Sequence, residues 1–292
     1  MDLRHLRYFI TIAETGSFTE AARKLCTVQP SLSRQIKDLE THIGGDLLIR
    51  GSRRVSLTET GRVFLDESRL VLAQYERAIE SARRAARGVR RSMTAGFDYG
   101  LEQKYLFRVS GMMQDQPETE LNFRSLPAPL LMKEVRDGSC DLAFVPRSDD
   151  LHDLEFFELD RMPLIAVLHQ SHPLAQKASI SASDLSAETV ISASEKMGPA
   201  LYHACCDFAG RNSAEIHFDQ QAGSLTMAIS LIQNLRQVAL TPSYSPEIFP
   251  DDIRMIPLSG DVPEIAMGMI WRSDNTSADM HKLLDGFRPT AG

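Results

Sequence analysis

The stretch GSFTEAARKLCTVQPSLSRQIKDLE, residues 16–40, decides the fold of the N-terminal part of this chain. Ser17 is a favourable helix N-cap, and Glu20 follows at the spacing of a capping box. Pro30 suits the first turn of a second helix, because the N–H that proline lacks has no partner there. The stretch therefore predicts a short helix, a break over residues 26–29 and a second helix.

The second predicted helix is amphipathic. Its apolar face has residues at spacings of four, three and four: Leu32, Ile36, Leu39 and Ile43. Its opposite face is polar and includes Ser31, Ser33, Arg34 and Lys37. Gly44 and Gly45 end the helix. In a helix-turn-helix, a second helix of this kind places its polar N-terminal residues in the DNA major groove.

The flanking segments complete a compact unit. Residues 3–14 have apolar side chains at helical spacing and predict a helix before the quoted stretch. Residues 47–58, LLIRGSRRVSLT, predict two short strands around a basic turn, a wing. Thr58 is expected to cap a long helix that runs to about Gly88 and carries an apolar stripe. A solitary helix of this length requires a partner, so it predicts a dimerising helix.

Charge is distributed unevenly along the 292 residues, whose formal net charge is −7. Residues 1–92 have a net charge of +6 and residues 93–292 a net charge of −13. This asymmetry is consistent with nucleic-acid contact by the basic part and, equally, with a chance imbalance of charges on solvated faces. No apolar run has the length of a membrane helix and the N-terminus lacks the pattern of a signal peptide, so we expect a cytoplasmic protein that does not associate with a membrane. Four scattered cysteines do not form a disulfide framework.

From Met93 onward the pattern changes to short apolar runs alternating with helical segments. The strand-like runs are MTAGF, ELNFRSL, CDLAFV, PLIAVLH, TVISA, QVALTP and EIAMGMIW. This alternation predicts a largely parallel sheet with helices on both faces. Two such units with chain crossing between them would leave a cleft at the strand ends, where ligands bind.

Four segments together resemble the winged helix-turn-helix of LysR-type transcriptional regulators: LRYF at 6–9, GSFTEAARKL at 16–25, QPSLSRQIKDLE at 29–40 and SLTETG at 56–61. The resemblance covers essentially the whole chain. Within the family, RHLRYF and GDVPEIAMGMIWR are most similar to regulators of aromatic-acid catabolism, such as the phenylpropionate/cinnamate-responsive activator.

The resemblance implies a fold and its boundaries. An N-terminal all-α winged helix-turn-helix (1–58) and a long linker helix (59–91) would precede an α/β effector domain (92–292). That domain would consist of two Rossmann-like subdomains, similar to type 2 periplasmic binding proteins. Subdomain I would span about 92–163 and 267–292, and subdomain II about 164–266.

The resemblance also implies partners. They are a dyad-symmetric promoter DNA, a small-molecule effector in place of any other cofactor, a second copy or three further copies of the chain, and RNA polymerase if the protein activates. Arg34 can donate two hydrogen bonds to guanine and Gln29 two to adenine. The wing arginines would contact phosphates. The expected DNA-binding residues are Thr27, Gln29, Pro30, Ser31, Ser33, Arg34, Lys37, Arg50, Arg53 and Arg54, with Pro30 in a structural role.

For the effector, the resemblance points to segments at the ends of four strands. They are Phe97, Asp98, Tyr99, Gly100 and Leu101; Ser125, Leu126, Pro127 and Ala128; Pro146; and Ser192 and Ala193. Members that bind carboxylic acids place hydroxyl side chains around the carboxylate. Gly100 and Ala128 lack them here, and Asp98 adds a negative charge. Acidic, neutral, amine-bearing and larger apolar effectors therefore all stay open.

Other functions were weighed on the same residues. We find no G-x-S-x-G, H-E-x-x-H or P-loop motif, so an enzyme is not predicted. His203, Cys205 and Cys206 would form a metal site only on a distorted helix, because adjacent residues diverge by about 100° on a regular one. The alternative is a redox-responsive or effector-independent regulator of the same fold, although adjacent cysteines pair poorly. Cys26 is expected to pack as a small apolar residue. The family's usual Gly-x-Gly before QVALTP is replaced by Leu235, Arg236 and Gln237.

Overall fold

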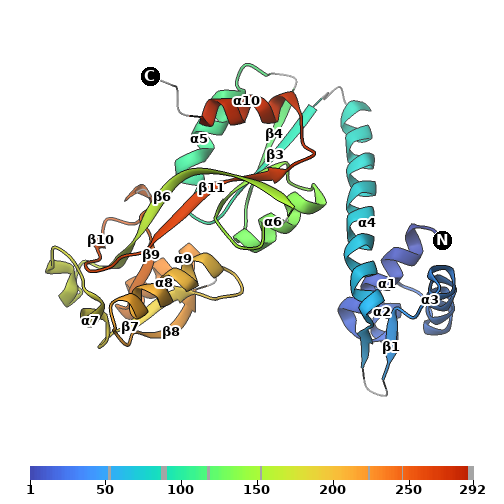
Figure 1. Cartoon of the computed structure of the whole chain (residues 1–292), viewed down its shortest axis with the longest axis horizontal. Coiled ribbons are helices and arrows are strands. Elements are labelled where there is room, and N and C mark those ends of the chain that lie inside the picture. Colours follow the sequence, from blue (N-terminus) through green and yellow to red (C-terminus); the bar gives the residue numbers. More distant parts are fainter. Residues whose placement is uncertain are drawn as a thin grey trace. The chain divides into compact units, whose positions relative to one another are not determined.

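A computed structural model describes residues 1–51, 54–86, 91–116, 119–151, 153–222, 224–244 and 246–288 (Figure 1). The chain divides into two compact units, Met1–Arg87 and Gly88–Gly292. Within the described ranges, no helix combines the length and apolar character needed to cross a membrane.

The first unit contains the predicted helix-turn-helix and wing. Its elements are α1 (Leu3–Thr15), α2 (Phe18–Lys24), α3 (Gln29–Ile43), the antiparallel pair β1 (Leu48–Arg50) and β2 (Val55–Leu57), and α4 (Glu59–Ala86). The Ser17 hydroxyl accepts a hydrogen bond from the Glu20 backbone N–H. The Glu20 carboxylate pairs with Arg23 at 2.5 Å, so it does not complete the expected capping box. Pro30 lies in the first turn of α3, and Gly44 ends it at φ 83°.

The core of this unit explains why the helices pack together. Buried residues from α1, α2 and α3 meet, including Phe9, Leu32 and Ile36, and the Phe9 and Phe64 rings lie 5.3 Å apart. The expected cap of α4 is present, because the Thr58 hydroxyl accepts from the Gly61 N–H at 2.9 Å. The prediction for Cys26 was wrong. The residue is exposed, and its φ of 50° turns the chain out of α2.

The second unit is built on one nine-stranded sheet with the order β4-β3-β5-β11-β6-β9-β7-β8, and β10 pairs with β6. The strands are β3 (Arg91–Phe97), β4 (Thr119–Ser125), β5 (Leu142–Pro146), β6 (Leu154–His169), β7 (Thr189–Ala193), β8 (His217–Ala222), β9 (Val238–Pro242), β10 (Ile253–Pro257) and β11 (Glu264–Arg272). The helices are α5 (Glu102–Met113), α6 (Ala128–Asp137), α7 (Ala182–Leu185), α8 (Pro199–Arg211), α9 (Leu225–Leu235) and α10 (Ala278–Phe287), with 3-10 turns at Pro173–Gln176 and Pro246–Ile248.

The sheet is mixed rather than largely parallel. Pairings of β3 with β4 and β5, and of β7 with β8 and β9, are parallel, as expected for strand-helix alternation. The antiparallel pairings all involve the two long strands β6 and β11. Figure 1 shows these two strands side by side, joining the part that contains β3, β4 and β5 to the part that contains β7, β8 and β9. Strands that cross between two α/β halves return in the opposite direction, which accounts for the difference.

Helix α9 ends in a way that the sequence left open. Arg236 is the C-cap in the left-handed conformation, with φ 57° and ψ 29°, and its N–H donates to the carbonyl of Ile232. A residue with a Cβ adopts this conformation at a cost of about 1–2 kcal/mol, whereas glycine adopts it freely. The end of α9 therefore has the left-handed backbone conformation that glycine usually adopts, although the residue here is an arginine.

Candidate functional site

The polar face of α3 is available at the surface of the first unit. Arg34 and Lys37 are exposed on this helix, while the side chains at Leu32 and Ile36 are fully buried beneath them. Arg34 has no ion-pair partner within the described part of the chain. The remaining expected contacts on this element divide into exposed Gln29, Pro30 and Ser31 and half-buried Thr27 and Ser33. The helix thus presents hydroxyl, amide and cationic donors at its N-terminal half, as base readout requires.

The wing is described only in part. Strand β1 includes Arg50, whose side chain lies outside the description, and Arg53 also falls outside the described residues. Arg54 is exposed immediately before β2, where its side chain approaches Gly16. One of the three predicted phosphate contacts is therefore placed on the surface.

The second unit contains a cavity of about 1000 Å³, at the upper end of the sizes usual for small-molecule sites. Its lining comes from the carboxyl ends of several strands. Asp98 follows β3, Ala128 begins the helix after β4, Pro146 ends β5, Ala193 ends β7 and Thr241 lies at the end of β9. Carboxyl ends of parallel strands converge at one edge of a sheet, which explains why residues so distant in sequence line one space.

Six of the twelve expected effector residues line this cavity: Asp98, Tyr99, Ala128, Pro146, Ser192 and Ala193. The other six lie outside the lining. Phe97 and Leu101 are buried in the core, Ser125 is exposed at the end of β4, and Leu126 and Pro127 lead the chain into α6. Gly100 adopts φ 91°, and a Cβ there would lie 3.1 Å from the Tyr244 ring.

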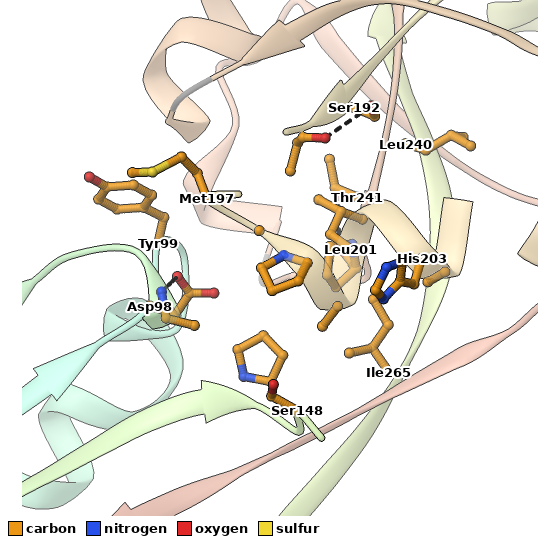
Figure 2. A pocket seen from close by; sticks show the side chains of 18 of the residues that line it. Asp98, Tyr99, Ser148, Ser192, Met197, Leu201, His203, Leu240, Thr241 and Ile265 are labelled. Carbon is orange, nitrogen blue, oxygen red and sulfur yellow. Dashed lines mark hydrogen bonds between the residues drawn. The ribbon is translucent and has the colours of Figure 1, made fainter. Parts of the chain in front are cut away.

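Asp98 is the carboxylate of the lining whose pKa is clearly shifted. Its partly buried carboxylate accepts a hydrogen bond from the Ala128 N–H at 2.9 Å and points into the cavity (Figure 2). Burial raises the pKa of Asp98 to about 7, and the negative charge of Glu102 adds to the rise, while the N–H groups of Ala128 and Tyr99 oppose it. Burial also raises the pKa of Tyr244, with a further contribution from Asp98.

The wall of the cavity opposite Asp98 contributes two hydroxyls that already donate hydrogen bonds within the protein. Ser192 donates to the carbonyl of Ala193 at 3.2 Å, and Thr241 donates to the carbonyl of Pro242 at 2.8 Å. Ser192 and Thr241 lie across the space from Asp98 in Figure 2. The wall also includes the start of α8, where Gly198 caps the helix without a side-chain hydrogen bond.

The sequence reasoning missed several lining residues. Thr241 and Pro242 end the run QVALTP, so a rule that places ligands at strand ends would have found them, although the resemblance did not point to them. The segment Met197–Leu201 carried a signal too, because a Gly-Pro pair there opens a helix. No pattern in the sequence marked Tyr244, since this residue reaches the cavity from irregular chain beyond β9. Three guanidinium groups also line the cavity: Arg147, Arg161 and Arg211.

All four cysteines are free thiols. Cys205 is fully buried and Cys206 is exposed, as expected for adjacent residues on a helix. Burial raises the pKa of the Cys205 thiol and raises the pKa of Cys140 to about 12, which makes both poor nucleophiles. Among the residues that the structure describes, no cluster of three metal-ligating side chains exists.

Comparison with known proteins identifies both units. Residues 3–62 match the family described as bacterial regulatory helix-turn-helix protein, lysR family, and residues 99–291 match the LysR substrate binding domain. The chain is 33% identical to the Hca operon transcriptional activator HcaR of Escherichia coli (strain K12) over 93% of its own length and 92% of that protein. This match agrees with the subgroup resemblance found in the sequence.

Two solved structures are similar over almost the whole chain. Full-length BenM is 25% identical, with a TM-score of 0.60, and the match covers 99% of this chain and 96% of that one. Full-length CbnR in complex with its target DNA is 20% identical, with a TM-score of 0.69 and 99% of each chain covered, which supports the fold. The chain belongs to the LysR family: it is a DNA-binding transcriptional regulator with an N-terminal helix-turn-helix and a C-terminal effector-binding domain.

Proposed function

We propose that this regulator reads its promoter with the exposed face of α3 and responds to a small molecule bound in the 1000 Å³ cavity of its effector domain. The observation that carries the proposal is the convergence of five strand ends on that cavity, next to a carboxylate with a perturbed pKa. Base contacts would come from Gln29 and Arg34, and phosphate contacts from Lys37 and the wing.

The same proposal sets the domain boundaries at residues 58/59 and 91/92, with subdomain boundaries near 163/164 and 266/267. The strand pairings support the latter two positions. Strand β6 pairs with β11 up to Pro163 and with β9 from Leu164, and β11 pairs with β5 from Met267. The cavity would thus lie between the two subdomains. A regulator of promoter DNA would act in the cytoplasm.

Helix α4 would form the dimer. Large apolar side chains are exposed along it: Val63, Leu70, Val71, Tyr75 and Ile79. An exposed apolar stripe on a 28-residue helix is typical of an interhelical contact. Val71→Glu should lower the oligomeric state in sedimentation velocity, whereas Arg62→Ala, exposed on the opposite side of the same helix, should not. Unchanged sedimentation of the Val71 variant would rule out this contact.

Two variants test the coupling of the sites. Leu201→Trp enlarges a side chain that lines the cavity (Figure 2) and should abolish ligand-induced stabilisation while leaving DNA affinity without ligand intact. Arg34→Ala should do the reverse. A ligand that stabilises the Leu201 variant as much as the unaltered protein would place the effector elsewhere.

A further inference from the structure

We propose that the effector carries a protonated amine and that Asp98 recognises it. The inference rests on the proposed function, because it assigns the ligand class of the same cavity. The ligand class is inferred from the hydrogen-bond donors and acceptors of the cavity lining, and from the lining groups that already have a partner within the protein.

The start of α6 is occupied by the chain's own carboxylate. The N-terminus of a helix attracts anions, since its first N–H groups point outward and its dipole is positive there. Here the Ala128 N–H donates to Oδ1 of Asp98 at 2.9 Å. A ligand carboxylate at this position would have to displace Asp98 or lie against a like charge. The Asp98 carboxylate therefore already occupies the anion site at the N-terminus of α6.

Within the described ranges Asp98 has no ion pair. Two basic side chains of the same domain are engaged with other carboxylates. Lys104 pairs with Asp160, and the Arg161 guanidinium donates to Glu158 at 2.8 Å. The charged group that bears on the pKa of Asp98 is the carboxylate of Glu102, which raises it. A desolvated carboxylate without a counter-charge is costly, and an ammonium group of a ligand would remove that cost.

The wall opposite Asp98 also offers acceptors. The Ser192 and Thr241 hydroxyls donate their hydrogen bonds to backbone carbonyls, so their oxygens can only accept hydrogen bonds from a ligand. Binding a carboxylate through them would break both internal hydrogen bonds. An ammonium group has three donors and no acceptor, which complements this arrangement.

Two positions at which a hydroxyl could hold a ligand carboxylate offer none. At Gly100 a side chain would meet the Tyr244 ring, and the φ of 91° is unfavourable for any residue with a Cβ, so no hydroxyl is available there. Ala128 has no polar group. Of the three arginines in the lining, Arg211 is held by Asp207 and Asp261, and Arg147 lies over the Phe156 ring.

The test uses calorimetry and thermal shift on the full chain at pH 8, where Asp98 is ionised. The probes are matched sets of primary amine, carboxylate and alcohol on three skeletons: phenylmethyl, 3-phenylpropyl and hexyl. Amines should stabilise the protein more than the matched acid or alcohol. Asp98→Asn, which keeps an oxygen for the Ala128 N–H, should weaken amine binding about tenfold to a hundredfold.

Asp115→Asn is the matched control, since it removes an exposed carboxylate of the same domain outside the cavity lining, and it should bind amines as the unaltered protein does. Three results would overturn the inference. They are no stabilisation by any amine, stronger stabilisation by a carboxylate (the outcome expected for binding at the uncapped start of α8), and full amine affinity in the Asp98 variant. If a carboxylate ligand bound the unaltered protein and not Leu201→Trp, the cavity would still be the effector site, and only the assignment of an amine ligand would be rejected. Ligands indifferent to Leu201→Trp would instead reject the cavity as the effector site.

Discussion

The Asp98 carboxylate accepts a hydrogen bond from the backbone N–H of Ala128, the first residue of α6, at 2.9 Å. Two strand ends of the effector domain are joined by this bond, since Asp98 follows β3 and Ala128 follows β4. The carboxylate occupies the position at which a helix dipole would hold an anion, and it remains directed into the cavity (Figure 2).

Asp98 should make the stability of the apoprotein depend on pH. Because its pKa is raised to about 7 in the folded state, the unfolded chain releases the proton first, and stability falls as pH rises from about 4 to 7. Asp98→Asn removes this penalty. Between pH 5 and pH 8 the variant should gain about 1–3 kcal/mol relative to the unaltered protein in urea unfolding.

Asp115→Asn provides the reference for that experiment, because the residue is exposed beyond the end of α5. Its difference from the unaltered protein should be the same at both pH values. If the Asp98 variant also showed a pH-independent difference, the carboxylate would have to be ionised in the fold without cost.

Gly61 should be intolerant of substitution although it lies in a helix. A Cβ at this position would lie 2.0 Å from the Leu47 carbonyl oxygen, so the wing and α4 would have to separate. Gly61→Ala should destabilise the first unit by several kcal/mol, on the order of a severe core mutation, and abolish DNA binding. Thermal unfolding of the variant measures this directly.

Gly111 is the matched control for Gly61. It lies within α5, and a Cβ there meets no atom within 4 Å. Gly111→Ala should therefore stabilise the protein by about 0.5–1 kcal/mol, the usual gain in helix propensity. Equal losses in both variants would contradict the steric account of Gly61.

Arg236 is a site for stabilisation. Its φ of 57° is unfavourable for a residue with a Cβ, and the side chain is exposed at the end of α9. Arg236→Gly should raise stability by about 1 kcal/mol, whereas Arg236→Ala keeps the Cβ and should not. Chemical denaturation of both variants separates the backbone effect from loss of the guanidinium. A stabilised alanine variant would assign the gain to the charge instead.

The sequence predicted the first unit well because its rules are local. Ser17, Pro30 and Gly44 set helix ends through their own backbone requirements, and the alternation of buried and exposed positions on α3 followed from spacing alone. The long-range features were harder. The antiparallel pairings of β6 and β11 depend on chain crossing that no local pattern specifies, so the sheet was expected to be largely parallel.

The lining residues of the cavity likewise include some that could be predicted from the sequence and some that could not. Residues at strand ends, such as Asp98 and Ala193, were expected from the family resemblance, and they line the cavity because strand ends converge at one edge of the sheet. Tyr244 was missed, because it packs against Gly100 from irregular chain far away in sequence. The departure from Gly-x-Gly at Arg236 was visible in the sequence, but its consequence, a strained helix end, required the backbone angles.

Helix α3 is the element assigned to read DNA, and one binding measurement tests this assignment most directly. A dyad-symmetric site selected by the unaltered protein from random DNA is titrated with Arg34→Ala and with Arg254→Ala, an exposed arginine of the effector domain, by fluorescence anisotropy. The Arg34 variant should lose about 1–3 kcal/mol per half-site and should no longer prefer the selected site over random DNA. The Arg254 variant should bind normally. Unchanged affinity and preference in the Arg34 variant would contradict the assignment.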